Sequence, residues 1–422
     1  MSLPKVLVAT LSAPELSRLA IELDRRGALT QYVRPYTNKG RIWERVLERT
    51  PRLGSVYRRT LGRRVPPAGL APGKVIEAGT LPDFAAAGLG RLPLGSAERR
   101  HHLVQRMSFA TEIAVARAAG RYARGADVVV ASYGTGVEGF AAVKRRGGRA
   151  VLHYPAAHNR YQRRLMAEDA QHSPEFAAAL PDFDAVPEEY ERRRERECAE
   201  ADRILVASSF ARQAFVAEGY DPEKIVAIAF GVDSGRFSPP RAPARRERFR
   251  VLFVGHIGQR KGVSYLLQGY ESFRRADSEL QLVGSFVPGA AQAYQRFAGL
   301  FEHIPHVPQA QLPDIYRAAD VFVLPTLTEG MPLVVLEAMA CGLPVIATPN
   351  GPGDLIEDGA DGFIVPIRDP QAIAEKLEIL YRDPQLRATL GRRARDKALR
   401  FGWDVYARRA ADAVTNFQRP GA

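Results

Sequence analysis

One stretch of the chain, residues 320–350, constrains the fold more than any other because it contains a complete strand, loop, helix and strand. Its apolar run VFVL, residues 321–324, is too short for a helix and is followed by proline, which predicts a buried parallel strand. After a short loop, Pro332 suits the first position of a helix, and LVVLEAMA has an apolar face that ends at the breaker Gly342. A second strand, VIAT, follows. Open α/β sheets bind ligands at the carboxyl ends of such strands, so a ligand site is expected at the start of this helix.

Two carboxylates flank that helix start. Glu329 lies in the loop before it, and Glu337 lies about one and a half turns inside, at ~3.6 residues per turn. The free N–H groups and the positive end of the helix dipole between them attract phosphate. A nucleoside diphosphate fits: its phosphate would contact backbone donors near Met331, Leu333 and Val334, and a buried glutamate would accept hydrogen bonds from a ribose diol. The other glutamate is then free to hold a second polyol.

The spacing E-x7-E within the phrase EGMPLVVLEAMACGLPVIAT resembles the signature of the retaining glycosyltransferases of family 4 and their close relatives. The resemblance extends over about the C-terminal half of the chain and includes FVGHIGQRKGVSYLL and RILVASSFARQAFVAEGY. It implies an α/β protein with the GT-B fold, in which two Rossmann-like domains face each other across a cleft. The alternative, in which Glu329 and Glu337 are a loop acid and a solvated helix residue, would be favoured only for an isolated E-x7-E.

The resemblance also implies a division into domains. Residues 1–223 would form the N-terminal, acceptor-side domain, joined by a C-terminal helix within residues 400–422, and residues 224–399 would form the domain that binds the nucleotide-sugar donor. A chain of 422 residues with 46% hydrophobic content is sufficient for two cores. We expect the hinge near residues 220–224.

The loop GHIGQRK, residues 255–261, carries the cations of the expected site. Relatives often have arginine directly after the first glycine, where this chain has His256. Lys261 matches the family lysine, and with Arg260 it would offset the negative charge that a leaving nucleoside diphosphate gains as the glycosidic bond breaks. Arg260 can bind phosphate through its planar fork, whereas lysine acts as a point charge. The alternative, two surface cations at a helix start, would place positive charge against the positive end of the helix dipole, which is unfavourable without a bound anion.

In relatives the backbone of the segment 303–309 meets the nucleotide base, which would place His306 and Val307 near it. The donor-binding residues that the resemblance implies are Gly255, His256, Arg260, Lys261, Val307, Glu329, Gly330, Met331, Pro332, Leu333, Val334 and Glu337.

Two histidines in the segment HYPAAHNRYQRRL are further candidates for the active site. Family 4 enzymes often have a functional histidine just after this strand. Position favours His153, and the wording PAAH at the start of an expected helix favours His158. A lone histidine is more often structural, but with two at one strand end we expect at least one to line the active site. The catalytic candidates are therefore Lys261, Arg260, Glu329, His153 and His158.

A literal G-x-G-x-x-G, from Gly134 to Gly139, follows the strand expected over residues 127–132 and invites a dinucleotide-binding interpretation. The acidic residue expected at the end of the next strand is missing, because that strand ends in His153 and Tyr154. We therefore attribute the glycines to close packing of a helix on the sheet.

The net charge of +13, from 60 Lys plus Arg against 47 Asp plus Glu, predicts anionic partners. The block with the highest density of positive charge runs from Arg41 to Arg64 and contains eight arginines interleaved with apolar residues. This pattern fits a basic amphipathic segment on an anionic membrane surface, and it fits a solvated arginine-rich helix equally well. No recognition motif for nucleic acid accompanies the charge. Residues 35–93 are otherwise expected to be an irregular acceptor-side insertion.

The two cysteines, Cys198 and Cys341, are far apart in the sequence, which argues against a disulfide framework and indicates a reducing compartment.

The N-terminus lacks the apolar segment of a signal peptide, and the sequence contains no run of about 18 apolar residues that would predict a spanning helix. We expect a cytoplasmic protein that could also lie on the inner face of the membrane. The sequence contains one Asp-x-Asp, Asp182-Phe-Asp184, which lies in a segment expected to be irregular and away from the donor motif, so neither a metal nor another cofactor is expected.

Together these patterns predict a retaining glycosyltransferase that moves a sugar from a nucleoside-diphosphate-sugar to a glycan or lipid-linked acceptor, in polysaccharide or glycoconjugate biosynthesis. The alternatives are an enzyme like sucrose or glycogen synthase, and a catalytically idle scaffold that binds nucleotide-sugars.

Overall fold

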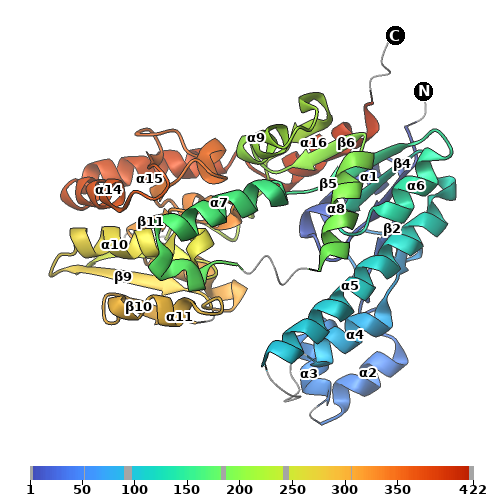
Figure 1. Cartoon of the computed structure of the whole chain (residues 1–422), viewed down its shortest axis with the longest axis horizontal. Coiled ribbons are helices and arrows are strands. Elements are labelled where there is room, and N and C mark those ends of the chain that lie inside the picture. The colour runs from blue at the N-terminus through green and yellow to red at the C-terminus, as the bar shows by residue number, and fades with distance from the viewer. Residues whose placement is uncertain are drawn as a thin grey trace. The chain divides into compact units, whose positions relative to one another are not determined.

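The structure is a computed structural model that describes residues 3–51, 53–89, 97–181, 187–240, 247–305 and 307–417. The chain divides into two units (Figure 1). The first comprises Met1–Tyr154, Val186–Leu205 and Ala407–Ala422, and the second comprises Pro155–Ala185 and Val206–Tyr406. Residues 155–185 and 206–223 thus pack with the second unit, although the sequence placed them in the N-terminal domain. Which unit binds donor and which binds acceptor stays a prediction.

The first sheet has seven strands in the order β3-β2-β1-β4-β5-β6-β7. Their bounds are β1 (Val6–Ala9), β2 (Leu29–Arg34), β3 (Val75–Glu77), β4 (Val128–Ser132), β5 (Arg149–His153), β6 (Arg203–Val206) and β7 (Ile225–Ala227). In this order, each pair of neighbouring strands from β3 through β2, β1, β4 and β5 to β6 is parallel. The central strands β1 and β4 are wholly buried, as expected of a parallel sheet that helices cover on both faces. The helices of this unit include α1 (Pro14–Arg25), α5 (Ala97–Tyr122), α6 (Val137–Lys144) and α8 (Glu188–Glu200).

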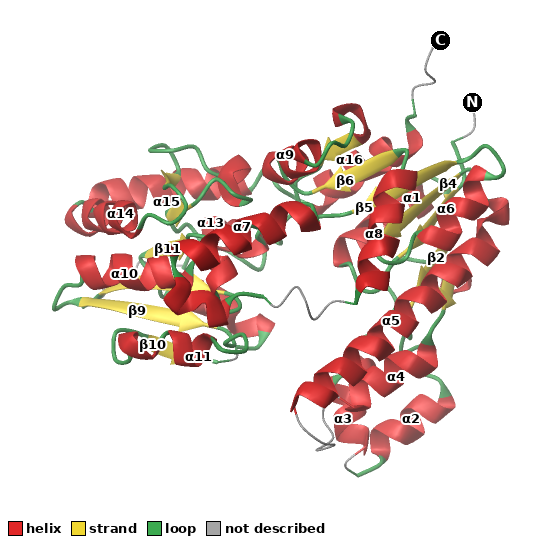
Figure 2. Cartoon of the chain, in the orientation of Figure 1, coloured by secondary structure: helices red, strands yellow, loops and turns green. Residues whose placement is uncertain are grey.

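The prediction that residues 35–93 are irregular is wrong, because this region contains α2 (Ile42–Arg49), α3 (Leu53–Arg59) and α4 (Thr80–Leu89) as well as β3. Figure 2 shows these helices grouped beside α5. A small core of Tyr36, Tyr57 and Leu61 holds them. The hydroxyl of Tyr36 donates to Oε1 of Glu44 at 2.7 Å, and Glu44 is fully buried. No helix in the described part of the chain is long and apolar enough to cross a bilayer.

The G-x-G-x-x-G segment binds a carboxylate of the protein itself. Glu197 of α8 is fully buried and accepts hydrogen bonds from the backbone N–H groups of Gly134 (2.6 Å), Gly136 (2.6 Å) and Val137 (3.3 Å). Burial raises the pKa of Glu197 to about 7, although these N–H groups favour its charged form. Gly139 packs against β4, where a Cβ atom would lie 3.1 Å from a valine methyl group, so the packing interpretation is confirmed for this glycine.

The second sheet has six parallel strands in the order β10-β9-β8-β11-β12-β13. Their bounds are β8 (Phe249–Val254), β9 (Ser278–Val283), β10 (Glu302–Ile304), β11 (Val321–Leu324), β12 (Val345–Ala347) and β13 (Gly362–Ile364). The helices are α7 (Asn159–His172), α9 (Ser209–Ala217), α10 (Val263–Phe273), α11 (Ala290–Ala293), α12 (Leu312–Arg317), α13 (Leu333–Ala340), α14 (Pro370–Arg382) and α15 (Pro384–Ala398). The last helix, α16 (Trp403–Thr415), begins in this unit and ends in the first.

The predicted strand at residues 321–324 is confirmed with the same limits, as β11. The side chain of Ser208 caps α9, because its hydroxyl accepts from the N–H of Ala211 at 3.2 Å. Pro332 is the N-cap of α13 rather than its first residue, one position earlier than predicted. Because β8, β11 and β12 run in parallel, the loops that follow them all leave the same edge of the sheet.

Candidate functional site

The loops after β8 and β11 rest directly on each other. Arg260, in a short 3-10 turn, accepts through its carbonyl oxygen from the N–H of Leu327 at 2.9 Å and from the hydroxyl of Thr326 at 3.1 Å. Gly262 follows with φ +69°, and a Cβ atom there would overlap the carbonyl oxygen of Pro325. Only glycine combines this left-handed backbone with so close an approach. The contact fixes the two cations of the first loop beside the second loop.

Arg260 and Lys261 both contact one oxygen of Glu329. The Nζ atom of Lys261 lies 2.5 Å from Oε1 of Glu329, and Nη1 of Arg260 binds that same oxygen. Arg260 also donates to the carbonyl oxygen of Thr328 at 3.1 Å. The sequence placed these three residues in one site, and the structure brings them together.

Burial and charge act against each other in this cluster. The side chains of Lys261 and Glu329 are only 12% and 15% exposed. Burial lowers the pKa of Lys261, although Glu329 opposes the shift. Burial alone would raise the pKa of Glu329, but Lys261 and Arg260 outweigh it and hold that pKa below its usual value. Glu329 is therefore a carboxylate held between two cations.

The loop after β12 supports Glu329 from behind, which the sequence did not predict. The N–H of Glu329 donates to the carbonyl oxygen of Asn350 at 3.1 Å, and the side chain of Asn350 donates to that of Leu327 at 2.8 Å. The available signal was the Asn-Gly pair just after the strand VIAT, because that strand ends at the same sheet edge. Asn350 therefore helps to set where the Glu329 side chain begins.

The start of α13 offers backbone donors next to this cluster. Leu333 and Val334 are half-buried, and within the described part of the chain no protein acceptor faces their N–H groups. The first N–H groups of a helix have no partner inside the helix and bind anions well. Gly330 is buried against Pro155, where a Cβ atom would overlap the proline carbonyl oxygen. Met331 is also buried, and its sulfur accepts from the N–H of Phe230 at 3.2 Å.

Glu337 lies within α13 with one oxygen engaged. The hydroxyl of Tyr316 donates to its Oε2 at 2.9 Å, and among the described residues no donor binds its Oε1. Burial raises the pKa of Glu337, although the bond from Tyr316 opposes the shift. A half-buried carboxylate with one oxygen left to accept suits a neutral polyhydroxyl ligand.

A comparison with protein families matches residues 248–383 to the family described as Glycosyl transferases group 1. The match contains Arg260, Lys261, Glu329 and Glu337. This segment of the second unit belongs to the family.

Two curated relatives of the chain carry the same name. The chain is 36% identical over 203 residues to the D-inositol 3-phosphate glycosyltransferase of Paenarthrobacter aurescens, a match of 44% of this chain and 50% of the relative. It is 33% identical over 264 residues to the protein of the same name from Kineococcus radiotolerans, a match of 54% of this chain and 61% of the relative. The chain thus spans between half and about three fifths of the curated relatives it matches.

Solved structures match nearly the whole chain. Sucrose-phosphate synthase from Thermosynechococcus elongatus has a TM-score of 0.64 at 18% identity, covering 97% of this chain and 98% of that one. Anabaena HepE in complex with UDP and glucose has a TM-score of 0.63 at 17% identity, covering 98% and 100%. These likenesses confirm the expected α/β GT-B fold.

Other donor-site predictions for the group 1 unit have less support from geometry. Gly255 follows β8, and its N–H donates to the carbonyl oxygen of Val283 at 2.9 Å. His256 is exposed and Val307 is half-buried. In the described part of the chain no hydrogen bond or ion pair joins either to the Glu329 cluster. His306, like Asp182 and Asp184, lies outside the described residues.

The two histidine candidates lie in different units. His153 ends β5 in the first unit, with Nε2 3.9 Å from Oε1 of Glu15, and burial lowers the pKa of His153 to about 3. His158 caps α7 in the second unit by accepting from the N–H of Arg160 at 3.3 Å. Its ring packs against Phe215 and Tyr220, and burial lowers the pKa of His158 to about 4. These contacts give His158 a structural role, and an active-site role for either histidine stays a prediction.

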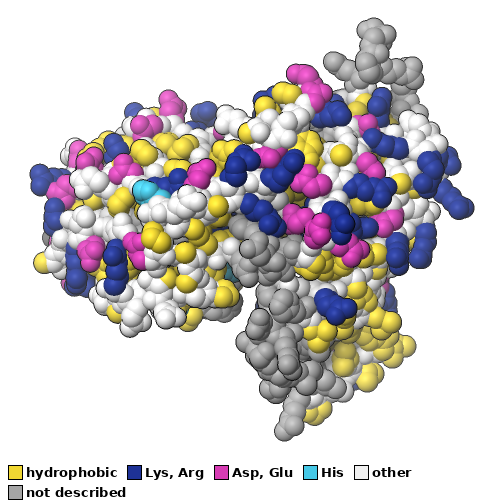
Figure 3. All heavy atoms as spheres, viewed as in Figure 1, with side chains coloured by type: hydrophobic (Ala, Val, Ile, Leu, Met, Phe, Trp, Pro, Cys, Tyr) yellow, Lys and Arg dark blue, Asp and Glu magenta, His cyan; other side chains and the backbone are white. Residues whose placement is uncertain are grey.

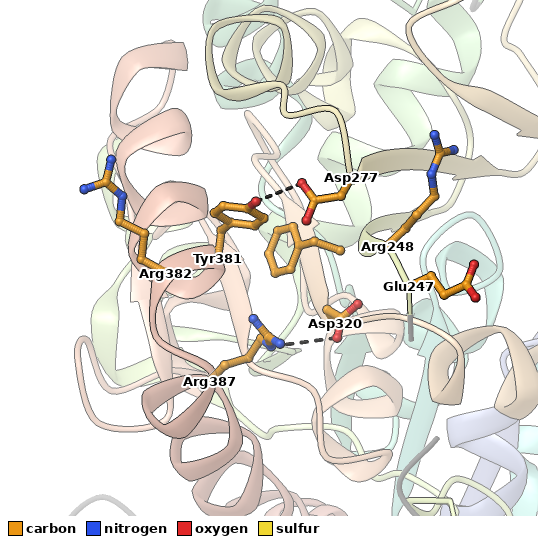
Figure 4. A pocket seen from close by; sticks show the side chains of 8 residues that line it. Glu247, Arg248, Asp277, Asp320, Tyr381, Arg382 and Arg387 are labelled. Carbon is orange, nitrogen blue, oxygen red and sulfur yellow. Dashed lines mark hydrogen bonds and ion pairs between the residues drawn. The ribbon is translucent and has the colours of Figure 1, made fainter. Parts of the chain in front are cut away.

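A cavity of about 480 Å³ lies at the other edge of the second sheet, where β8, β9 and β11 begin (Figure 4). Four of its polar side chains form two pairs. The hydroxyl of Tyr381 donates to Asp277 at 2.8 Å, and Arg387 lies 3.7 Å from Asp320. The cavity therefore lies at the opposite edge of the sheet from the cluster of Arg260, Lys261 and Glu329.

Proposed function

We propose that this protein transfers a sugar from a nucleoside-diphosphate-sugar to an acceptor, with retention of the anomeric configuration. The observation that carries the proposal is the meeting of Arg260 and Lys261 with Glu329 beside the start of α13. HepE, which shares the fold, has been solved with UDP and with UDP-glucose, and this supports a nucleotide-sugar as the donor.

Each part of the site has a role in this proposal. The diphosphate contacts Arg260, Lys261 and the N–H groups at the start of α13. When the glycosidic bond breaks, the leaving diphosphate gains negative charge, and cations already in place stabilise that state more than the bound donor. Glu337 accepts hydrogen bonds from the ribose diol through Oε1. Glu329 is left to bind hydroxyl groups of the sugar.

We propose further that the reaction needs no metal, because two cations and a helix N-terminus already offset the charge of the diphosphate. Donor turnover should then continue in EDTA, and an absolute requirement for manganese or magnesium would contradict this part.

For the acceptor we propose a glycan or a lipid-linked sugar, handled at the inner face of a membrane. The supporting observation is α2, where Ile42, Trp43 and Val46 are 76%, 43% and 59% exposed beside the exposed Arg45 and Arg49. Figure 3 shows hydrophobic side chains at the surface of this region. A second candidate is a soluble acceptor, as in an enzyme like sucrose synthase. The name of the curated relatives, which contains D-inositol 3-phosphate, favours a soluble acceptor of the phosphorylated polyol class.

The experiment begins by measuring thermal stabilisation by UDP, GDP and ADP, because a ligand that binds only the folded state raises its stability. The matching nucleotide-sugars are then incubated with the protein, and the released diphosphate and the anomer of the product are followed by NMR. The proposal expects release of one nucleoside diphosphate and a product with the donor's anomeric configuration. An inverted product would contradict retention, and binding without any release would favour the idle scaffold.

A further inference from the structure

We infer that Glu329 is the internal counter-anion of Arg260 and Lys261 and that the donor's diphosphate competes with it for these two cations. This inference rests on the proposed function and gives Glu329 a second role besides binding the sugar. Binding of the diphosphate would transfer both cations from the carboxylate to phosphate oxygens and release Glu329 toward the sugar.

The geometry of the cluster supports such a competition. Both cations converge on a single oxygen, Oε1 of Glu329, with Lys261 at 2.5 Å. One carboxylate therefore satisfies two positive charges, and the cluster retains an excess of one positive charge. The other oxygen of Glu329 receives no hydrogen bond from the described residues. The N–H groups of Leu333 and Val334 nearby also lack protein acceptors within the described part of the chain.

Burial makes the counter-anion necessary. Lys261 and Glu329 are almost enclosed, at 12% and 15% side-chain exposure, and a charge removed from water is costly unless it is paired. If the carboxylate of Glu329 is lost, Lys261 and Arg260 must find another anion, and a diphosphate is the anion that the proposed function supplies. Removing the negative charge of Glu329 should therefore strengthen diphosphate binding rather than weaken it.

This outcome separates the inference from a simpler role. If Glu329 only accepts hydrogen bonds from the sugar, the substitution Glu329→Gln would leave the affinity for a ligand without sugar unchanged. If Glu329 competes with the diphosphate, the same substitution raises that affinity. In both cases transfer of the sugar slows, because the amide is a poorer acceptor for the sugar hydroxyl groups.

The test uses inorganic pyrophosphate, which carries neither base nor sugar, and the full chain in isothermal titration calorimetry. We expect Glu329→Gln to bind pyrophosphate at least about fivefold more tightly than the unsubstituted protein, while its donor turnover falls. Unchanged or weaker binding of pyrophosphate by Glu329→Gln would overturn the inference.

A matched control is available in the same sheet. Glu279 of β9 also lies between two arginines, at 2.5 Å from Nε of Arg250 and 3.7 Å from Nη1 of Arg248. Its loss should leave pyrophosphate affinity and donor turnover unchanged. If Glu279→Gln tightened pyrophosphate binding as much as Glu329→Gln, the effect would come from net charge alone and the inference would fail.

Thermal melting covers the case in which Glu329→Gln is too unstable for calorimetry. The variant should melt at a lower temperature than the unsubstituted protein and gain more from added pyrophosphate, since the anion replaces the lost carboxylate. A smaller gain than in the unsubstituted protein would count against the inference. Failure of the proposed function looks different: Glu329→Gln then binds pyrophosphate more tightly, but the unsubstituted protein releases no nucleoside diphosphate from any donor.

Discussion

At the scale of single residues, Glu337 has a simple arrangement, because Tyr316 engages one of its oxygens and the other faces no donor among the described residues. We expect Glu337→Ala to weaken nucleoside diphosphate binding by about 1.5–3 kcal/mol, the worth of hydrogen bonds to a charged group. Calorimetry with the best-stabilising nucleotide measures this. Tyr316→Phe removes only the supporting bond and should cost less. Unchanged affinity in Glu337→Ala would remove this residue from the site.

The burial of His158 predicts that the stability of the fold depends on pH. Burial lowers the pKa of His158 to about 4, whereas an unfolded histidine titrates near 6.5. The unfolded chain therefore binds the extra proton first, so the stability from neutral His158 is complete above about pH 6.5 and is lost as the pH falls toward 4.

Asn is one of the preferred N-cap residues and does not titrate, which makes His158→Asn a suitable comparison. Between pH 7.5 and pH 5, the unsubstituted protein should lose about 1–2 kcal/mol more stability than His158→Asn, as a shift of one pKa unit is worth about 1.4 kcal/mol. Urea unfolding at the two pH values measures the difference. Parallel losses in both proteins would contradict it.

At the scale of elements, one buried carboxylate of α7 binds three other segments of the second unit. Asp169 is fully buried and accepts from the hydroxyl of Tyr265 at 2.6 Å, Nε2 of Gln259 at 2.8 Å and Nε of Arg368 at 3.0 Å. Arg368 is held there with φ +63°, which is rare for a residue with a side chain. Gln259 directly precedes Arg260, so this network also supports the cation loop.

We expect Asp169→Ala to lower the free energy of unfolding by about 3–5 kcal/mol, because it leaves Arg368, whose side chain is only 18% exposed, without its buried carboxylate. Glu168→Ala is the matched control, since Glu168 is the neighbouring residue, lies 3.6 Å from Arg368 and is 57% exposed. The control should change stability by no more than about 0.5 kcal/mol. Urea denaturation of both variants decides the matter, and equal losses would contradict the role given to Asp169.

Some elements of the fold could be predicted from local sequence patterns, and others could not. The strand β11, the helix α13 and the meeting of Lys261 with Glu329 all follow from local patterns plus one rule, that parallel strands present their following loops at one edge. Glu197 could not be found this way. The sequence of its helix α8, EEYERRRERECAE, is typical of a charged, solvated surface. Only the folded chain brings this one carboxylate to the N–H groups of Gly134, Gly136 and Val137.

The helices α2 and α3 were missed for a related reason. Their arginines and turns suggested an irregular insertion, and the pairing of Tyr36 with Tyr57 and Glu44 that holds them is not visible in any short window. Likewise, the packing of His158 against Phe215 and Tyr220 and the support from Asn350 depend on neighbours far away in the sequence.

At the scale of the whole molecule, the charge of +13 and the apolar face of α2 lead to a prediction about membranes. The protein should sediment with phosphatidylcholine vesicles that contain phosphatidylglycerol and not with phosphatidylcholine alone, because exposed arginines are attracted to an anionic surface. The double variant Ile42→Ser and Val46→Ser should bind at least about tenfold more weakly, since burying one such side chain is worth about 1.5–3 kcal/mol.

Ile379→Ser is the control for the vesicle experiment, because Ile379 is 39% exposed on α14 in the second unit. It should leave vesicle binding unchanged. Equal binding by the double variant and the unsubstituted protein would remove α2 from any membrane contact and favour the soluble acceptor.

The proposed sugar transfer as a whole depends on the two cations beside Glu329. Its most direct test is single-turnover cleavage of the preferred nucleotide-sugar by the unsubstituted protein and by Lys261→Ala, with Lys397→Ala, a lysine paired with Asp361 elsewhere in the second unit, as control. We predict that Lys261→Ala cleaves the donor about 100-fold or more slowly, the scale of losing one preorganised stabilising group, while the control keeps its rate. Cleavage by Lys261→Ala at the unsubstituted rate would contradict the account.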